Sequence, residues 1–261
     1  MLPMADRALV ERILPRAEAF AREAGDLTLR YFGSTMHAED KADGSPVTEA
    51  DREAEGLLRT RIAAEFPTHG IVGEEQGSHQ PDAEIRWTLD PIDGTRAFMR
   101  GVPLYAVLVG VSIRDRPAVG VVHLPALGDT VVAGTGLGCW WNGTRASVST
   151  QGDLSRSLVL TTDVEEILRR PQGPGWRRLA GEAHTSRTWG DAYGHVLVAT
   201  GRAEVMIDPV LNDWDAAPLL PILEEAGGRF TDLEGRHTVL GRSGISTNGF
   251  LHEQVLAALA G

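Results

Sequence analysis

The stretch from Leu104 to Gly134 constrains the fold most, because it is rich in valine, leucine and glycine. β-Branched and aliphatic side chains favour a pleated surface and glycines mark turns, so this stretch predicts a meander of three strands. Asn142-Gly143 follows it and is a strong hairpin signal, because both central residues of a tight hairpin turn need a positive φ. The first half of the chain is therefore expected to contain an antiparallel sheet.

Helical periodicity precedes this predicted sheet. Apolar residues recur at helical spacing from about Ala8 to Phe32, and Gly33 is a stop signal for that helix. After a polar loop, Thr48 and Asp51 form a capping-box-like start for a second helix, which ends before Pro67. The first half of the chain therefore mixes helices with strands.

Two short strands deliver acidic residues in this half. Ile71-Val72 predicts a buried strand with Glu74 and Glu75 at its end. Residues 87–90 predict another strand, and Pro91 breaks it because proline cannot donate to a strand ladder. Both strands therefore end at carboxylates.

Beyond about Thr150 helices and strands alternate. The predicted elements are helices over 191–200 and 213–226, strands over 203–207 and 245–247, and a last helix over 251–259. The predicted fold class is thus α+β in the first half and α/β in the second, packed in layers. We expect the halves to be 1–150, with most of the metal ligands, and 151–261, compact enough together to count as one domain.

Charge and cysteine content exclude several classes of protein. The chain of 261 residues has 36 Asp and Glu against 25 Lys and Arg, a formal net charge of −11. This excess argues against nucleic acid as a partner, since a phosphate backbone is met by clustered Lys and Arg. A phosphorylated small molecule can still bind if a metal ion inverts the local charge. A single cysteine, Cys139, excludes an internal disulfide framework and a cysteine-rich zinc site.

Targeting signals are not evident. No stretch approaches the roughly 18 uninterrupted apolar residues of a membrane span. The N-terminal segment is typical of an amphipathic helix rather than of a signal peptide. The expected location is the cytoplasm.

The segment WTLDPIDGTRAF, residues 87–98, carries the strongest chemical signal. Asp90 and Asp93 follow a hydrophobic strand, and Gly94-Thr95 opens a short helix whose N–H groups could hold an anion. Two aspartates on one constrained turn repel each other unless a hard cation such as Mg²⁺ binds between them. An Asp-Gly turn with solvated carboxylates is the alternative for this segment taken alone.

Four ordered motifs resemble the inositol monophosphatase family of Mg²⁺-dependent phosphomonoesterases, over nearly the whole chain. They are Lys41-x-Asp43-x-Ser45-Pro46-Val47-Thr48-x-x-Asp51, Gly73-Glu74-Glu75, Asp90-Pro91-Ile92-Asp93-Gly94-Thr95, and Trp214-Asp215-Ala216-Ala217 leading into Glu225-Ala226-Gly227-Gly228. The resemblance implies a layered αβαβα sandwich, commonly a homodimer, and a site with two or three Mg²⁺ ions.

The resemblance also implies roles for individual residues. A first Mg²⁺ would be surrounded by Glu74, Asp90, the Ile92 carbonyl and Thr95, and a second by Asp90, Asp93 and Asp215. Glu74 would also lie near a weaker third ion. Asp51 would orient Thr95, and these two with Glu74 would position the attacking water. The N–H groups of Gly94 and Thr95 would hold phosphate oxygens, with Lys41 near the phosphate or in a loop salt bridge.

Other phosphatase chemistries fit the sequence less well. Cys139 and Arg145 match the Cys-x5-Arg spacing of cysteine-dependent phosphatases, but the Asn142-Gly143 turn predicts a hairpin in place of the loop and helix that lower the thiol pKa. The aspartyl-phosphate motif Asp-x-Asp-Gly-Thr is also excluded, because Asp90 and Asp93 have one residue too many between them. A non-catalytic metal- or phosphate-binding protein is the remaining alternative.

The residues expected around the leaving group favour the histidinol-phosphatase branch of the family. The stretches Thr95–Phe98 and Gly190–His195 resemble that branch, and Asp208 falls where family members place an acid that contacts the substrate alcohol. Histidinol phosphate carries an ammonium group and an imidazole, so Asp191 and Asp208 would supply anions for it. Asp191 could instead be a helix N-cap.

The predicted activity is therefore hydrolysis of L-histidinol phosphate to histidinol, a step of histidine biosynthesis. Inositol 1-phosphate or another sugar phosphate is the alternative substrate within the same family. Asp93 is also assigned to substrate binding. So is Arg187, either at a second phosphate site or at the active site of the partner in a dimer.

Overall fold

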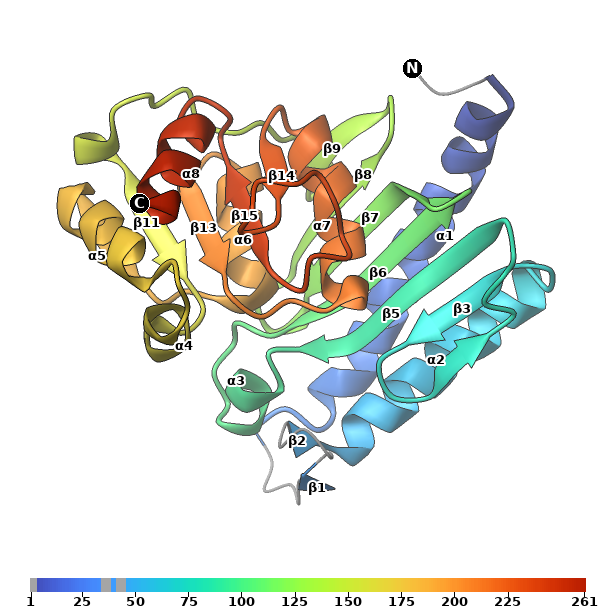
Figure 1. The fold of residues 1–261 in the computed structure, drawn as a ribbon. Coiled ribbons are helices and arrows are strands. Elements are labelled where there is room, and N and C mark those ends of the chain that lie inside the picture. Colours follow the sequence, from blue (N-terminus) through green and yellow to red (C-terminus); the bar gives the residue numbers. More distant parts are fainter. Residues whose placement is uncertain (1–3, 34–38, 41–45) are drawn as a thin grey trace.

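The computed structural model describes residues 4–33, 39–40 and 46–261 and shows a sandwich of five layers (Figure 1). An eight-stranded sheet and a five-stranded sheet lie on either side of a central pair of helices, and further helices cover the outer face of each sheet. This is the αβαβα arrangement that the family resemblance implies. Within the described ranges, the helices lack the length and hydropathy that crossing a bilayer demands.

The outer layer beside the larger sheet consists of α1 (Met4–Leu29) and α2 (Glu49–Glu65). α1 ends three residues before the predicted Phe32, and the chain then turns to Gly33 at φ 75°. The capping box predicted at the start of α2 is present, and the Thr48 N–H donates to Asp51 Oδ2 at 2.8 Å. Apolar side chains of both helices pack against the sheet.

The larger sheet has the strand order β10-β9-β8-β7-β6-β5-β3-β4. The predicted meander is confirmed as three successive antiparallel strands, and the predicted hairpin joins β9 to β10 with Asn142 and Gly143 both at positive φ. The strands are β3 (Gly70–Gly73), β4 (Gly77–His79), β5 (Ile85–Asp93), β6 (Ala106–Ile113), β7 (Arg116–Leu124), β8 (Asp129–Gly134), β9 (Gly138–Trp141) and β10 (Thr144–Arg145). Two further strands of two residues each, β1 (Glu39–Asp40) and β2 (Pro46–Val47), pair with each other and are not part of this sheet.

The prediction that Pro91 breaks its strand is wrong. β5 continues through Pro91 to Asp93, and its register against β6 shifts between Asp90 and Asp93. This bulge accommodates proline, because a bulged residue does not need to donate to the neighbouring strand. The bulge therefore re-aims the end of β5, where the two aspartates lie.

The smaller sheet has the order β12-β11-β13-β15-β14. β11 runs parallel to β12 and β13, and β15 runs antiparallel to β13 and β14. Its strands are β11 (Leu158–Thr161), β12 (Thr185–Arg187), β13 (Val205–Asp208), β14 (Arg229–Thr231) and β15 (Gly244–Thr247).

Five further α-helices pack on this sheet or between the sheets. α6 (Asp191–Ala199) and α7 (Asp213–Glu225) form the central layer, and α4 (Val164–Arg169), α5 (Gly173–Glu182) and α8 (His252–Ala260) cover the outer face.

The predicted elements beyond residue 190 are confirmed, with small differences at their ends. The elements between 151 and 190 were not assigned from sequence. One apolar cluster draws on both halves of the chain, and the division at residue 150 stays a prediction.

α7 lies directly on the larger sheet because two glycines face it. Gly110 of β6 and Gly120 of β7 are register partners. A Cβ on Gly120 would lie 2.0 Å from the Pro218 carbonyl oxygen, and one on Gly110 would lie 3.1 Å from the Pro218 nitrogen. Only glycine allows this approach, which brings the start of α7 to the end of β5.

Candidate metal and phosphate site

Three carboxylates meet where the end of β5 faces the start of α7. Asp90, Asp93 and Asp215 each offer one carboxylate oxygen, and these oxygens all lie within 4.8 Å of one another. Asp90 and Asp215 are buried, and Asp93 is half-buried. The structure thus brings together the three residues that the family resemblance places around the second ion.

Each carboxylate is oriented by a backbone N–H group. Asp90 Oδ1 accepts from Ile92 at 2.9 Å, Asp93 Oδ2 accepts from Ala192 at 2.7 Å, and Asp215 Oδ2 accepts from Asn212 at 2.8 Å. Among the residues that the structure describes, the other Asp215 oxygen is buried and accepts no hydrogen bond. A buried acceptor of this kind needs a partner, and a cation would satisfy it.

The carboxylates of the cluster repel one another when they are ionised. Burial, followed by the charges of Glu74, Asp215 and Asp93, raises the pKa of Asp90 well above its ordinary value. Burial, with smaller contributions from neighbouring carboxylates, also raises the pKa of Asp93, and it raises that of Asp215 to about 7. A divalent cation would remove this repulsion, and an all-oxygen donor set suits Mg²⁺. The residues present therefore fit the metal that the family implies.

Glu74 lies at the edge of this cluster. It follows β3, its N–H donates to the Leu89 carbonyl of β5 at 3.1 Å, and its charge raises the pKa of both Asp90 and Asp215. Glu74 is not one of the three residues whose oxygens lie within 4.8 Å of one another. Asp51 is buried in the first turn of α2, and its proposed action on Thr95 stays a prediction.

The Gly94-Thr95 turn follows Asp93 directly in the chain. Gly94 has φ 80° and ψ 41°, a left-handed conformation that favours glycine, and α3 (Thr95–Met99) begins after it. The Thr95 hydroxyl donates to the Ile92 carbonyl at 3.1 Å. A Cβ on Gly94 would lie 3.0 Å from Asp191 Oδ2, so the Asp191 carboxylate lies against this turn.

Asp191 reaches the turn because the start of α6 has an unusual backbone. Gly190 is the N-cap, Asp191 has φ 51°, and the Asp191 N–H donates to Thr162 Oγ1 at 3.0 Å. The alternative reading of Asp191 as an N-cap is wrong. The Thr162 hydroxyl in turn donates to Asp208 Oδ2 at 2.7 Å. Burial and the Asp208 charge raise the pKa of Asp191 to about 7, against an opposing effect of Arg96.

Asp208 is buried at the end of β13, and each of its carboxylate oxygens accepts a hydrogen bond from this chain's own donors. Oδ2 accepts from Thr162, and Oδ1 accepts from the Val210 N–H at 3.2 Å. His195 Nε2 lies 3.9 Å from Oδ2. Asp208 therefore adds negative charge behind Asp191 and supports it through Thr162.

One predicted site residue that the structure describes is not brought to the cluster. Arg187 is exposed at the end of the edge strand β12, where its guanidinium donates to the Thr185 hydroxyl at 2.8 Å and the Ser186 carbonyl at 2.7 Å. Within the described ranges, Arg187 makes no hydrogen bond or ion pair with the carboxylates, and its role stays a prediction. Lys41 lies outside the described residues, as do Asp43 and Ser45 of the same motif.

Sequence reasoning missed two residues of this region. Thr162 follows the Leu-Val-Leu-Thr run of β11, so a search for polar residues at strand ends would have found it. Glu55 is buried in α2 four residues after Asp51, the spacing that places two side chains on one helix face.

Cys139 cannot serve as a phosphatase nucleophile. It is fully buried in β9, and burial raises the pKa of its thiol to about 12. A hairpin turn follows it, as predicted, with Asn142 at φ 48°. The thiolate that this chemistry needs is therefore disfavoured.

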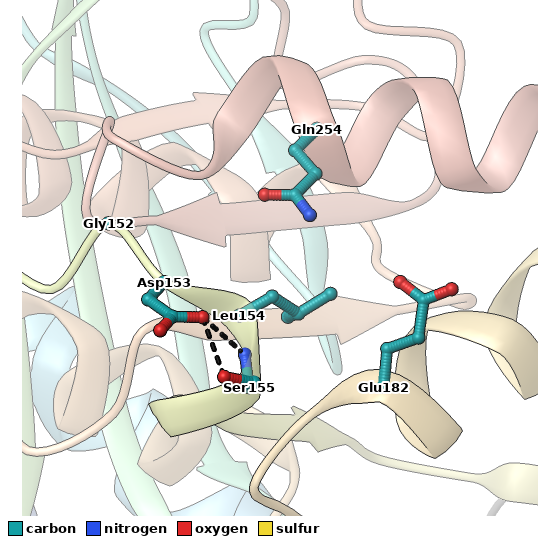
Figure 2. A pocket seen from close by; sticks show the side chains of 6 residues that line it. All are labelled: Gly152, Asp153, Leu154, Ser155, Glu182 and Gln254. Carbon is teal, nitrogen blue, oxygen red and sulfur yellow. Dashed lines mark hydrogen bonds between the residues drawn. The ribbon is translucent and has the colours of Figure 1, made fainter.

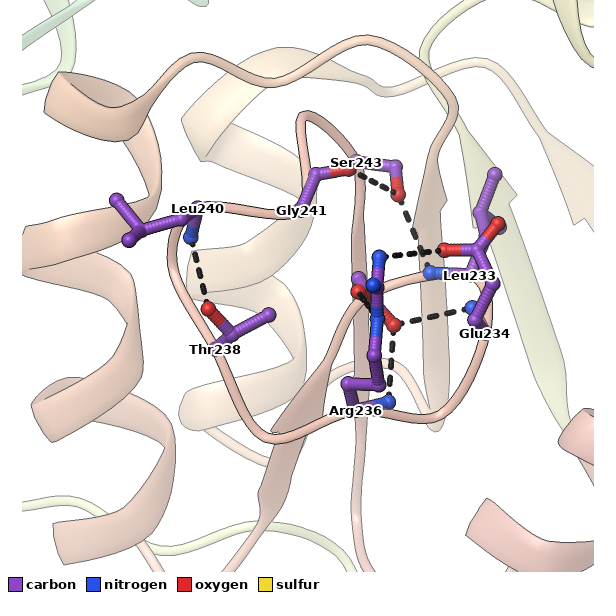
Figure 3. A network of polar contacts seen from close by, with 8 residues as sticks. Leu233, Glu234, Arg236, Thr238, Leu240, Gly241 and Ser243 are labelled. Carbon is purple, nitrogen blue, oxygen red and sulfur yellow. Dashed lines mark hydrogen bonds and ion pairs between the residues drawn. The ribbon is translucent and has the colours of Figure 1, made fainter.

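The loop between β14 and β15 holds a network of polar contacts (Figure 3), and its far end contacts the chain just before α7. The buried Asp232 carboxylate accepts the N–H groups of Glu234 at 3.0 Å and Arg236 at 2.9 Å, and Arg236 Nε at 2.7 Å. At the other end of the loop, the Arg242 carbonyl accepts the Leu211 N–H at 3.1 Å. This contact holds the chain just before the Asn212 cap.

A cavity of about 440 Å³ lies outside the acidic cluster (Figure 2). Its lining comes from the loop before β11, the end of α5 and the start of α8, with Asp153, Glu182 and Gln254 among its side chains. None of the predicted site residues lines it.

Comparisons with known proteins agree with this geometry. The model of the inositol monophosphatase family matches residues 9–261. The chain is 42% identical over 248 residues to a histidinol-phosphatase of Chlorobaculum parvum, covering 94% of this chain and 96% of that protein. It is 36% identical to a histidinol-phosphatase of Mycobacterium tuberculosis, covering 93% and 96%. An inositol monophosphatase structure from Zymomonas mobilis, 30% identical, superposes with a TM-score of 0.85 over 95% of this chain and 98% of that one.

Proposed function

Because the chain belongs to the inositol monophosphatase family and is a phosphoric monoester hydrolase, we propose that its substrate is L-histidinol phosphate. The observation that carries the proposal is the position of Asp191, whose carboxylate lies against the Gly94 turn with Asp208 behind it. Two acids near the proposed phosphate site suit an alcohol with a cationic end, and paired charges at a half-buried position discriminate strongly. The relatives named histidinol-phosphatase support the same choice.

The proposed metal is Mg²⁺, held by Asp90, Asp93 and Asp215, with Glu74, the Ile92 carbonyl and Thr95 around a further ion. When bound, Mg²⁺ would lower the pKa of a water molecule and stabilise the charge that develops on the leaving ester oxygen. No covalent intermediate with the protein is needed, and the roles of the residues rest on the family resemblance and on the geometry of the cluster.

The chain's own groups would bind and orient the reactants. The Thr95 hydroxyl donates a hydrogen bond to the Ile92 carbonyl, so its oxygen can accept a hydrogen bond from the attacking water. Glu74 would accept a second hydrogen bond from that water, and the N–H groups of Gly94 and Thr95 would hold phosphate oxygens. The water oxygen would bond to phosphorus as the P–O ester bond breaks. One hydrogen of the water would end on the histidinol oxygen, and the other would stay on the inorganic phosphate.

Asp191 would hold the substrate's cationic end. Its backbone N–H is held by Thr162 and its φ is left-handed, so the point from which the side chain extends is set before the substrate arrives. Burial keeps the Asp191 pKa near 7 in the free enzyme, and a bound ammonium group would favour its ionised form. Inositol, which offers neutral hydroxyls, would not gain from that charge.

The family resemblance alone supports the remaining parts of the proposal. We propose that the protein acts as a homodimer in the cytoplasm, in the step of histidine biosynthesis that releases histidinol.

A substrate comparison tests this proposal. Purified protein with Mg²⁺ is assayed for phosphate release from L-histidinol phosphate and from inositol 1-phosphate, with EDTA as the control. We expect kcat/KM for histidinol phosphate to be at least roughly tenfold higher, about 1.4 kcal/mol of transition-state binding. A preference for inositol 1-phosphate would refute the substrate and leave the phosphatase activity in place.

A further inference from the structure

A buried carboxylate from α2 holds the turn that presents Glu74. Gly73 pairs with Gly77 across the β3–β4 hairpin, so residues 74–76 form its turn, and α2 lies beside this hairpin (Figure 1). Glu55 of α2 is fully buried. Its Oε2 accepts the N–H of Glu75 at 2.7 Å, and its Oε1 accepts the N–H of Gln76 at 3.0 Å.

Arg59, one helical turn further along α2, completes this contact. Its Nε donates to Glu55 Oε1 at 2.7 Å, and its Nη2 donates to the Gly77 carbonyl. The guanidinium thus balances the buried charge and reaches the far side of the same turn. Gln76 adds a hydrogen bond from its side-chain amide to the Arg52 carbonyl at 3.0 Å.

Gly73 leaves the space that this pair of side chains occupies. A Cβ at Gly73 would lie 2.2 Å from Glu55 Oε1 and 2.7 Å from Arg59 Nη2. Neither side chain can withdraw without giving up its hydrogen bonds. The residue before Glu74 therefore has to be glycine for the Glu55 carboxylate to reach the turn.

This contact fixes Glu74 from its C-terminal side. Its own N–H is held by the Leu89 carbonyl of β5 at 3.1 Å, and the next two N–H groups are held by Glu55. The Glu74 charge raises the pKa of Asp90 and of Asp215, so its carboxylate lies near the acidic cluster, while Glu55 contacts the two residues that follow Glu74. A buried carboxylate is expensive to desolvate, and here all its described partners belong to α2 and the turn.

We propose that Glu55 is a positioning residue for metal binding: by holding the N–H groups of Glu75 and Gln76, it keeps the Glu74 carboxylate at the edge of the cluster. The inference rests on the proposed role of Glu74 as a metal ligand. Mutation of a group that orients a metal ligand commonly lowers metal affinity by about 10–100-fold.

Replacement of Glu55 by glutamine tests the proposal. Glutamine keeps the size of the side chain, but its NH2 group would face a backbone N–H and could not accept from it. The measurements are Mg²⁺ binding to the free enzyme by titration calorimetry, without substrate, and hydrogen exchange at the Glu75 and Gln76 amides. The control is Glu65→Gln, which removes a carboxylate of the same helix that pairs with Arg16 on the surface.

We expect E55Q to bind Mg²⁺ about 10–100-fold more weakly and to exchange both amides faster, while E65Q matches wild type. A folded E55Q variant with wild-type Mg²⁺ affinity would overturn the proposal. If E55Q does not fold, Arg59→Lys, which loses the contact to Gly77, should still weaken Mg²⁺ binding relative to Arg61→Lys, and equal affinities would overturn it. Wild-type protein that binds Mg²⁺ but does not hydrolyse histidinol phosphate would count against the proposed function alone.

Discussion

Replacing Asp191 by asparagine removes a charge from the substrate pocket with little change of shape. The backbone at this position has φ 51°, a region that asparagine tolerates as well as aspartate does. The N–H of the residue would still donate to Thr162, because that bond belongs to the backbone. We therefore expect a folded variant in which the negative charge beside Gly94 is lost.

The size of the effect follows from the position of the carboxylate. A substrate ammonium about 4 Å from it, at an effective dielectric constant of about 20, would be attracted by about 4 kcal/mol before desolvation is counted. Hydrogen bonds to charged groups contribute about 1.5–3 kcal/mol net. Because Asp191 is only half-buried, we expect its charge to contribute about 2 kcal/mol to transition-state binding. Loss of that contribution corresponds to a decrease of about 30-fold in kcat/KM for histidinol phosphate.

The assay is phosphate release at saturating Mg²⁺ with two substrates. For inositol 1-phosphate, Asp191→Asn should change kcat/KM little, since an amide can also hydrogen-bond to neutral hydroxyls. Asp163→Asn is the matched control, because Asp163 is an exposed N-cap of α4 and asparagine caps a helix equally well. Equal losses for both substrates, or no loss for histidinol phosphate, would refute the role of Asp191 in substrate choice.

The other predictions concern the cysteine and the pH dependence of stability. Because the Cys139 pKa is raised to about 12 by burial, iodoacetamide should leave activity unchanged under native conditions, and inactivation that follows labelling of Cys139 would contradict this. Without metal, the pKa values of Asp191 and Asp215 are about 7, against an ordinary value of 3.8, so the folded state binds more protons between these limits. The melting temperature of the metal-free protein should therefore fall as pH rises from about 4 to about 7, and it should fall less steeply in Asp215→Asn. Added Mg²⁺ should raise the melting temperature more at pH 7 than at pH 4. A pH slope that Asp215→Asn leaves unchanged would count against this reasoning.

Local signals in the sequence predicted much of the fold. The capping box at Thr48 and Asp51, the Asn142-Gly143 hairpin and the valine-rich meander each depend on residues close together in the chain. Such features are present in the structure because tertiary packing reinforces the local preference. The acids at the ends of β3 and β5 were likewise predictable as strand-end residues.

Features that depend on tertiary contacts were not predictable in this way. Pro91 looks like a strand breaker locally, yet a bulge against β6 accommodates it. The left-handed backbone of Asp191 is held by Thr162 from another strand. The spacing of Glu55 from Asp51 places both on one helix face but does not indicate what Glu55 binds, because its partners are the amides of a turn about twenty residues later.

Phosphate release by wild type and Asp93→Asn, with Mg²⁺ and with EDTA, most directly tests whether the carboxylates of β5 and α7 hold the metal that hydrolysis needs. We expect wild type to release phosphate from L-histidinol phosphate with Mg²⁺ and not with EDTA. We expect no measurable release by the variant, whose circular dichroism should remain that of wild type. Turnover by folded Asp93→Asn within about tenfold of wild type, or release that EDTA does not affect, would contradict this expectation.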